Sequence, residues 1–203
     1  MSEPDSVHPT TVDWQARFEA DDTPWERAGV HPAIAHWCAA GVLARGLSVY
    51  VPGCGRGLEP EAMAAAGLAV TASDSAPSAA ADQRRRLRAF DTAKVIDADS
   101  LEWRPPTPFD LLYEQTFLCA IHPRRRGAYE AMAYDVLKPG GRLLALFMQK
   151  DERGGPPYGC SLPAMQALFR PARWDWPEMA SFVPFPHPGL SGKPELAGIL
   201  TRR

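Results

Sequence analysis

A glycine-rich turn constrains the fold of this chain more than any other feature of its sequence. The apolar run Leu47–Val51 is typical of a buried strand, and it leads into the segment Pro52–Gly57, which reads PGCGRG. The stretch Glu59–Ala66 that follows has a helical pattern. Glycines carry no side chain and let the backbone approach a ligand closely. A strand, a glycine-rich turn and a helix in this order predict the first unit of an α/β sheet that binds a ligand at the turn.

Apolar runs and helical stretches continue to alternate along the middle of the chain. The predicted strands here are Leu68–Ser73, Lys94–Ala98, Phe109–Tyr113 and Arg142–Met148, and the predicted helices are Ser75–Phe90 and Pro123–Leu137. Strands and helices at this spacing form βαβ units, which give a parallel sheet with helices on both faces. The sequence therefore predicts a doubly wound α/β fold.

The last quarter of the chain is richer in proline and completes this sheet. A helix is expected over Ser161–Phe169, and two strands over Trp174–Val183 and Leu196–Leu200. Mixed sheets commonly carry an antiparallel edge, so the prediction is a mostly parallel, seven-stranded sheet whose last strand is antiparallel. The proline-rich stretch Phe182–Pro194 fits either a loop at the rim of a pocket or a stiff connection between the last two strands.

Length and charge limit what the chain can be. With 203 residues and about 150 residues per domain as a guide, we expect one domain over residues 1–203, in which residues 1–45 are a helical extension and residues 46–203 the core. The formal charge of -2 argues against binding of nucleic acid or anionic membranes. The arginines at 84–88 and 124–126 are more typical of solvated helix faces.

Other features indicate a reduced, metal-free cytoplasmic protein. No apolar stretch approaches the roughly 20 residues that a bilayer requires, and the acidic start has no pattern of a secretory signal. The cysteines Cys38, Cys54, Cys119 and Cys160 are scattered, without a CxxC pair, which disfavours a zinc site or a disulfide framework. We expect no metal site, no membrane contact and a monomer.

An acidic residue near the turn suggests which ligand it takes. Asp74 ends the second predicted strand, about 20 residues after the turn, where a carboxylate can accept hydrogen bonds from a ribose diol. The plainer interpretation is that Asp74 only caps the next helix. The GxGxG spacing, together with Glu59 and Glu61 in the first helical turn, disfavours a pyrophosphate at the helix N-terminus. S-adenosylmethionine is therefore favoured over a dinucleotide, and Asp99 and Ser100 after the third strand either meet its adenine or form a structural turn.

Several motifs together resemble a known family. They are TPWE at Thr23–Glu26, VPGCGRG at Val51–Gly57, the phrase Phe109–Met132, LKPGGRLL at Leu137–Leu144 and GGPPY at Gly154–Tyr158. From about Val12 to Thr201 the chain resembles the thiopurine S-methyltransferase superfamily, most closely its plant thiol and halide methyltransferase branch. The resemblance implies a class I, Rossmann-like methyltransferase fold in which residues 1–45 form a helical lid over the cofactor.

The resemblance also implies a set of cofactor contacts. Its aromatic contacts correspond to Trp14, Phe18 and Trp25, with Phe18 at a position where tryptophan is frequent. An aromatic ring attracts the positive charge of a sulfonium, and the weaker alternative for the tryptophans is that they only pin the N-terminal helix to the core. The other cofactor contacts implied are Gly53, Asp74, Asp99, Ser100 and Glu114, and we expect Gly55, Gly57 and Ser75 to contact the cofactor beside them.

On the substrate side, Tyr158 and Glu114 are candidate catalytic residues, as bases for the acceptor if one is needed. Tyr158 matches the family's substrate-side tyrosine, with loop packing as the alternative. Glu114-Gln115 stand where plant relatives often carry an Asp-Tyr pair, so one aromatic wall of the pocket is missing. His122 is a further candidate base, although a residue before a proline is more often a helix entry.

The function that these residues predict is methyl transfer from S-adenosylmethionine to a small soft nucleophile, most simply a thiol. Halide, selenium and tellurium acceptors fit the same pattern. Three other functions are weaker alternatives: a non-catalytic S-adenosylmethionine-binding protein, a nicotinamide-dependent oxidoreductase and a nucleic-acid methyltransferase.

Overall fold

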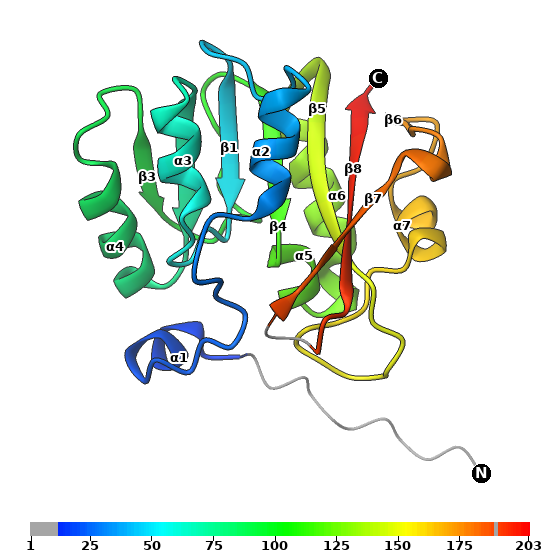
Figure 1. Cartoon of the computed structure of the whole chain (residues 1–203), viewed down its shortest axis with the longest axis horizontal. Coiled ribbons are helices and arrows are strands. Elements are labelled where there is room, and N and C mark those ends of the chain that lie inside the picture. Colours follow the sequence, from blue (N-terminus) through cyan, green and yellow to red (C-terminus); the bar gives the residue numbers. More distant parts are fainter. Residues whose placement is uncertain (1–11, 189–190) are drawn as a thin grey trace.

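The computed structural model describes residues 12–188 and 191–203, and it contains one eight-stranded sheet with helices on both faces (Figure 1). The strands are β1 (Ser48–Pro52), β2 (Ala69–Asp74), β3 (Lys94–Asp97), β4 (Phe109–Gln115), β5 (Leu137–Met148), β6 (Trp174–Asp175), β7 (Val183–Pro186) and β8 (Pro194–Arg202). The helices are α1 (Trp14–Glu19), α2 (Pro32–Ala39), α3 (Glu59–Ala65), α4 (Pro77–Leu87), α5 (Phe117–Ala120), α6 (Arg126–Val136) and α7 (Leu162–Leu168).

The strand order is β3-β2-β1-β4-β5-β8-β6, and β7 pairs with β8 beside this path. Strands β1 to β5 are parallel, whereas β8 runs antiparallel to β5, from Arg142 opposite Thr201 to Met148 opposite Glu195. The predicted doubly wound, mostly parallel sheet with an antiparallel last strand is thereby confirmed.

The prediction of one strand over Trp174–Val183 is wrong. Trp174–Asp175 and Val183–Pro186 are separate short strands that both pair with β8, and a 3-10 helix at Met179–Ser181 lies between them. Pro177 falls inside the predicted strand, and a proline cannot donate a ladder hydrogen bond. The sheet has eight strands rather than seven for this reason. The proline-rich stretch after Phe182 forms β7, which leads back to β8.

Two apolar layers hold the helices to the sheet, and strand alternation decides which side chain enters which layer. On β4, Leu111 and Tyr113 pack in the layer under α2 and α3, whereas Leu112 packs in the layer under α5 and α6. Glu114 follows in the same alternation, so it faces the α5 and α6 side.

The N-terminal segment has two parts with different positions. Helix α2 packs on the sheet, where Ala33, Ile34 and Trp37 are buried. Helix α1 lies beyond the carboxyl ends of the strands, at the lower edge of the molecule in Figure 1, and contacts α4. Of the N-terminal residues that the structure describes, Trp14 to Gly29 lie at the position expected for a lid, and this segment is called the lid segment below. Residues 1–11 lie outside the described part of the chain.

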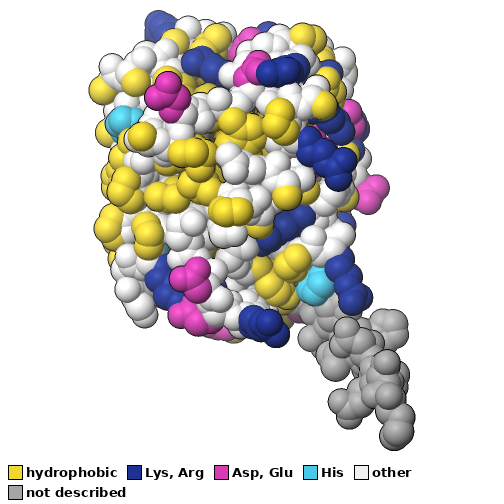
Figure 2. Space-filling view, turned by 90° about the vertical axis from the view of Figure 1, so that its right-hand side faces the viewer, with side chains coloured by type: hydrophobic (Ala, Val, Ile, Leu, Met, Phe, Trp, Pro, Cys, Tyr) yellow, Lys and Arg dark blue, Asp and Glu magenta, His cyan; other side chains and the backbone are white. Residues whose placement is uncertain are grey.

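Figure 2 shows the molecule from the side nearest α7 and β6, where hydrophobic side chains gather in the middle of the face and charged side chains lie around them. Val30 and Met179 are the large hydrophobic residues that the described part of the chain exposes. No helix of residues 12–188 and 191–203 is both long enough and apolar enough to cross a bilayer.

Candidate active site

A cavity of about 530 Å³ lies at the carboxyl ends of the central strands. Strand β1 has β2 on one side and β4 on the other, so the chain order reverses there, and open α/β sheets bind their ligands outside such a reversal. The turn after β1, the end of β4 and the lid segment form the cavity wall. The sequence-predicted residues that line it are Trp14, Phe18, Trp25, Gly53, Gly55, Gly57, Asp74, Ser75, Asp99 and Ser100.

The turn after β1 requires glycine for two local reasons. Gly53 and Gly55 have φ angles of 56° and 50°, in the left-handed region that side chains rarely adopt. A Cβ atom on Gly53 would also lie 2.3 Å from the ring of Phe117. The turn thus leaves bare backbone along the cavity, with Phe117 of α5 packed directly against it.

Asp74 holds this turn and lines the cavity at the same time. Its Oδ2 accepts a hydrogen bond from the Gly55 N–H at 2.8 Å, and its Oδ1 accepts one from the Ala76 N–H at 2.9 Å. Burial raises the pKa of Asp74, and the backbone N–H groups oppose that shift. A carboxylate oxygen has two lone pairs, so each oxygen keeps acceptor capacity for a ligand in the cavity.

Ser100 and Asp99 occupy different surroundings, although they are adjacent in sequence. The Ser100 Oγ accepts from the Gly53 N–H at 3.1 Å and lies 2.7 Å from the Ser73 Oγ, so Ser100 supports the glycine turn from below. Asp99 is more exposed and pairs with Arg125 at 3.1 Å. The Asp99 carboxylate is therefore accessible to a ligand, whereas the Ser100 hydroxyl is engaged in the turn.

Three aromatic side chains of the lid segment lie over the cavity. Trp25 makes edge contacts with Trp14 and Phe18, with ring centroids 5.4 Å and 5.9 Å apart. Phe18 is buried against Ala76 and Ala79 at the start of α4. These rings therefore do both things expected of them, because they pin α1 to the core and also line the cavity.

Glu114 and Tyr158, the two candidate catalytic residues, are not among the side chains that line the cavity. Glu114 faces away from it, 1% exposed, and its Oε1 accepts a hydrogen bond from the Leu118 N–H at 2.8 Å. Burial raises the pKa of Glu114 to about 7. The Tyr158 ring packs edge-on against His122, and Pro156 and Pro157 line the cavity instead.

His122 stands at a helix entry, which is the alternative that the sequence analysis set beside a role as a base. It precedes the 3-10 helix at Pro123–Arg125, and its Nδ1 accepts a hydrogen bond from the Arg124 N–H at 3.2 Å. A helix entry is therefore the observed role of His122.

The end of β4 supplies Thr116, a cavity residue that the sequence reasoning missed, beside Gln115, which it named only as the place where an aromatic wall is missing. Gln115 and Thr116 line the cavity, and the Tyr113 hydroxyl donates to the Gln115 Oε1 at 2.6 Å. Thr116 has a φ of 59°, which is rare for a β-branched residue and costs strain energy. The sequence signal that places Gln115 and Thr116 in the cavity is their position at the end of a strand beside the chain reversal.

A second missed feature is a buried charge centre beside the cavity. Glu195 of β8 is fully buried, and its Oε2 lies 2.7 Å from an Arg27 nitrogen and 3.2 Å from the His31 Nε2. Burial alone would raise the pKa of Glu195, but the hydrogen bonds from His31 and Arg27 lower it. Arg27 itself lines the cavity, so a fixed cation is present in the wall of the lid segment.

Two cysteines also line the cavity. Burial raises the pKa of Cys54 and of Cys119 well above that of a free thiol. Because the thiolate is the reactive form, both sulfurs stay protonated and poorly nucleophilic at neutral pH. Within residues 12–188 and 191–203, no group of three or more His, Cys, Asp or Glu side chains is arranged to hold a metal ion.

Comparisons with known proteins agree with this geometry. The model of the family described as thiopurine S-methyltransferase matches residues 10–181. "Probable thiol methyltransferase 2" of Arabidopsis thaliana is 35% identical over 162 residues, which cover 78% of this chain and 71% of that protein. "Thiocyanate methyltransferase 1" of Brassica oleracea is 32% identical over 170 residues, or 80% of this chain and 75% of that protein.

Among solved structures, Burkholderia thailandensis 1,6-didemethyltoxoflavin-N1-methyltransferase, bound to S-adenosylhomocysteine, is similar with a TM-score of 0.73 and 21% identity, covering 92% of this chain and 84% of that chain. Magnesium protoporphyrin IX methyltransferase from Synechocystis, also bound to S-adenosylhomocysteine, has a TM-score of 0.70 at 13% identity, covering 93% and 95%. At these identities the likeness shows the fold.

Proposed function

Because the chain belongs to the thiopurine S-methyltransferase family, we propose that it transfers a methyl group from S-adenosyl-L-methionine to a small thiol. The observation that carries this proposal is the coincidence of the family match with the cavity, which lies at the chain reversal and is lined by the glycine turn, Asp74 and the aromatic lid side chains. Relatives named for thiol and thiocyanate methylation support a soft sulfur acceptor.

The residues of the cavity fit this cofactor. Asp74 can accept hydrogen bonds from a ribose diol, and the bare backbone of Gly53 and Gly55 gives a ligand close access. Asp99 has an accessible carboxylate for an adenine amino group, and Ser75 lies beside Asp74 on the same wall. Trp25 and its aromatic neighbours line the cavity, and the face of an aromatic ring attracts a positively charged sulfur.

When bound, S-adenosyl-L-methionine would supply an electrophilic methyl group, which passes in line to the acceptor sulfur as its bond to the cofactor sulfur breaks and S-adenosylhomocysteine is left. The part of the protein is then to align the acceptor and to exclude water. The lid segment closes one side of the cavity, and Gln115, Thr116 and Cys119 close the side at the end of β4. Arg27 places a guanidinium in the wall, where its charge is paired with the buried Glu195.

Proton removal from the acceptor does not require a side chain of the protein in this scheme. A thiol with a pKa of about 8.5 is partly ionised at neutral pH, and anions such as thiocyanate have no proton to lose. Glu114 is buried behind the wall and bonded to the start of α5, so we assign it a positioning role for the cavity floor. Tyr158 contributes to the loop that places Pro156 and Pro157 at the rim.

The direct test is to detect S-adenosylhomocysteine by mass spectrometry after incubation of the purified protein with S-adenosyl-L-methionine and one acceptor at a time. The acceptors are hydrosulfide, a small alkyl thiol, thiophenol, a thiopurine, thiocyanate, iodide, and selenite or tellurite with a reductant. Turnover with thiols above the others supports the proposal. Turnover with only iodide, selenium or tellurium species would show that one of these, and not a thiol, is the acceptor.

Binding measurements separate the remaining alternatives, and S-adenosylhomocysteine binding is measured by calorimetry. Binding of S-adenosylhomocysteine without turnover on any acceptor would support a non-catalytic binding protein. Quenching of tryptophan fluorescence by NADH would support the oxidoreductase, and a gel shift of tRNA or DNA at moderate salt would support nucleic-acid methylation.

We further propose that the protein is a monomer located in the cytoplasm. Light scattering tests the oligomeric state, and cell fractionation tests the compartment.

A further inference from the structure

Arg56 is the residue of the glycine turn whose side chain leaves the turn and enters the lid segment. Its Nε donates to the Glu26 Oε1 at 2.8 Å, and a second nitrogen reaches the other Glu26 carboxylate oxygen at 3.2 Å. The same guanidinium donates to the Asp21 Oδ1 at 2.7 Å and to the Thr23 hydroxyl at 3.1 Å. One side chain thus binds three residues of the lid segment, and it also lies over the ring of Phe18, 5.6 Å from its centroid.

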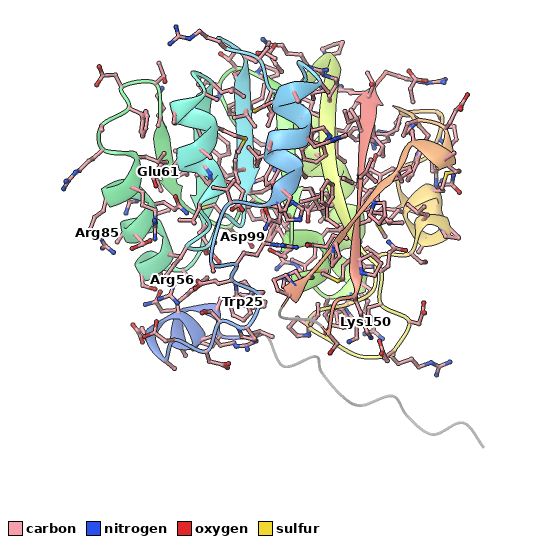
Figure 3. The ribbon with its side chains drawn as sticks, in the orientation of Figure 1. Trp25, Arg56, Glu61, Arg85, Asp99 and Lys150 are labelled. Atoms are coloured by element: carbon pink, nitrogen blue, oxygen red, sulfur yellow. The ribbon has the colours of Figure 1, made fainter. Side chains whose placement is uncertain are left out.

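These contacts differ from ordinary surface ion pairs. An isolated exposed pair contributes little to stability, whereas bidentate geometry and several partners make such a contact effective. The side chains of Arg56 and Glu26 are 24% and 29% exposed, so solvent screens them only in part. In Figure 3, Arg56 and Trp25 lie together at α1, although they come from different parts of the sequence, while Arg85 lies at the outer side of α4.

The position of Arg56 in the chain connects two parts of the cavity. The preceding residue, Gly55, is held by Asp74 through its N–H, and Asp74 is the proposed ribose acceptor. On the other side of the contact, Glu26 lies between Trp25 and Arg27, both of which line the cavity. A ligand that fixes the glycine turn at Gly55 therefore also fixes the backbone of the next residue, Arg56, whose side chain makes the lid contact.

We propose that Arg56 is a positioning residue that holds the lid segment closed over the bound cofactor and couples lid closure to the glycine turn. This inference rests on S-adenosyl-L-methionine as the ligand of the cavity. It follows that release of S-adenosylhomocysteine requires the contacts of Arg56 to break.

The test compares Arg56→Met with Arg85→Met, which removes an exposed arginine that pairs with Asp82 on α4. Dissociation of S-adenosylhomocysteine is followed by stopped-flow tryptophan fluorescence, and backbone hydrogen exchange is measured over residues 14–27 in the free and the loaded protein. Loss of the arginine contacts is expected to speed dissociation about tenfold, or about 1.4 kcal/mol, and to speed exchange in the lid segment. Arg85→Met should change neither.

Further variants separate coupling from general instability. Arg56→Lys keeps the charge but cannot form the forked contact, so an intermediate effect is expected. Glu26→Gln should reproduce most of the Arg56→Met effect, and the double variant should add little to it. The proposal would be overturned if Arg56→Met had the same dissociation rate and lid exchange as Arg85→Met. It would also be overturned if the effects of Arg56→Met and Glu26→Gln were additive in the double variant. If Arg56→Met does not fold, Arg56→Lys and Glu26→Gln are judged by the same criteria.

These readouts do not depend on methyl transfer. A protein that binds S-adenosylhomocysteine and releases it faster without Arg56, but methylates no thiol, would contradict the proposed function and leave the role of Arg56 intact. Normal thiol methylation together with unchanged dissociation and lid exchange in Arg56→Met would do the reverse.

Discussion

At the scale of single residues, the cavity wall depends on side chains that accept hydrogen bonds from the backbone and also line the cavity. Asp74 accepts from the Gly55 and Ala76 N–H groups while it lines the cavity. Ser100 also lines the cavity, although its Oγ is already engaged by Gly53 and Ser73, whereas Glu114 lies behind the wall and only supports Leu118. A substitution at Asp74 should therefore affect the ligand more directly than one at the other two.

We expect Asp74→Asn to weaken S-adenosylhomocysteine binding by about tenfold or more, because a hydrogen bond to a charged group contributes about 1.5 to 3 kcal/mol. Titration calorimetry measures the affinity. Asp91→Asn, the same change at an exposed aspartate, is the control and should bind like the parent protein. Equal affinity in all three proteins would remove Asp74 from the ribose site.

Glu114 predicts a pH dependence of stability. Burial raises its pKa from 4.5 to about 7, so between these values the folded chain holds a proton that the unfolded chain has lost. The unfolding free energy should therefore fall as the pH rises through this window, by at most about 3 kcal/mol. Glu114→Gln should lack this fall and exceed the parent protein in stability at pH 8, in urea titrations at several pH values.

The control for this prediction is Glu102→Gln, at an exposed carboxylate, which should keep the slope of the parent protein. A parent protein and a Glu114→Gln variant with parallel stability curves from pH 4 to pH 8 would mean that Glu114 is ionised normally in the folded chain.

At the scale of elements, the turn after β1 and helix α5 fit each other closely. The left-handed glycine at 53 brings the backbone against the Phe117 ring, and Thr116 adopts a strained conformation immediately before α5. Strain of this kind persists only where surrounding contacts enforce it. The two elements thus form one wall of the cavity and should respond together to a change in either.

We expect Gly53→Ala to displace Phe117, because the added Cβ would lie 2.3 Å from its ring, and to reduce S-adenosylhomocysteine affinity at least tenfold while the sheet stays folded. Gly127→Ala is the matched control, since Gly127 lies in α6 with no atom near its Cβ position. That change should raise stability by about 0.5 to 1 kcal/mol. Calorimetry and thermal melting distinguish the two, and normal binding by Gly53→Ala would show that the turn tolerates a side chain.

At the scale of the whole molecule, the proposed scheme requires no base from the protein, so the pH dependence of methylation should follow the acceptor. For two thiols of different pKa, kcat/KM should rise with pH up to each thiol's own pKa, and with iodide it should stay flat over the same range. Initial rates of S-adenosylhomocysteine formation measure this. One common inflection near pH 7 for every acceptor, iodide included, would instead point to Glu114.

Much of the fold followed from the sequence because its signals are local. The apolar run before Pro52–Gly57, the helix after it and Asp74 at the end of the next strand are all set by short-range periodicity and turn chemistry. The same signals place these residues at the carboxyl ends of parallel strands, where an open α/β sheet forms its ligand crevice.

Tertiary structure alone decided which side chains reach that crevice. Strand alternation turned Glu114 toward α5 and brought Gln115 to the cavity, and the division of β6 from β7 depended on pairing with β8. The contacts of Arg27 with Glu195 and of Arg56 with Glu26 join residues 168 and 30 positions apart. Such contacts leave no periodic trace in a single sequence, since they arise only when elements distant along the chain pack together.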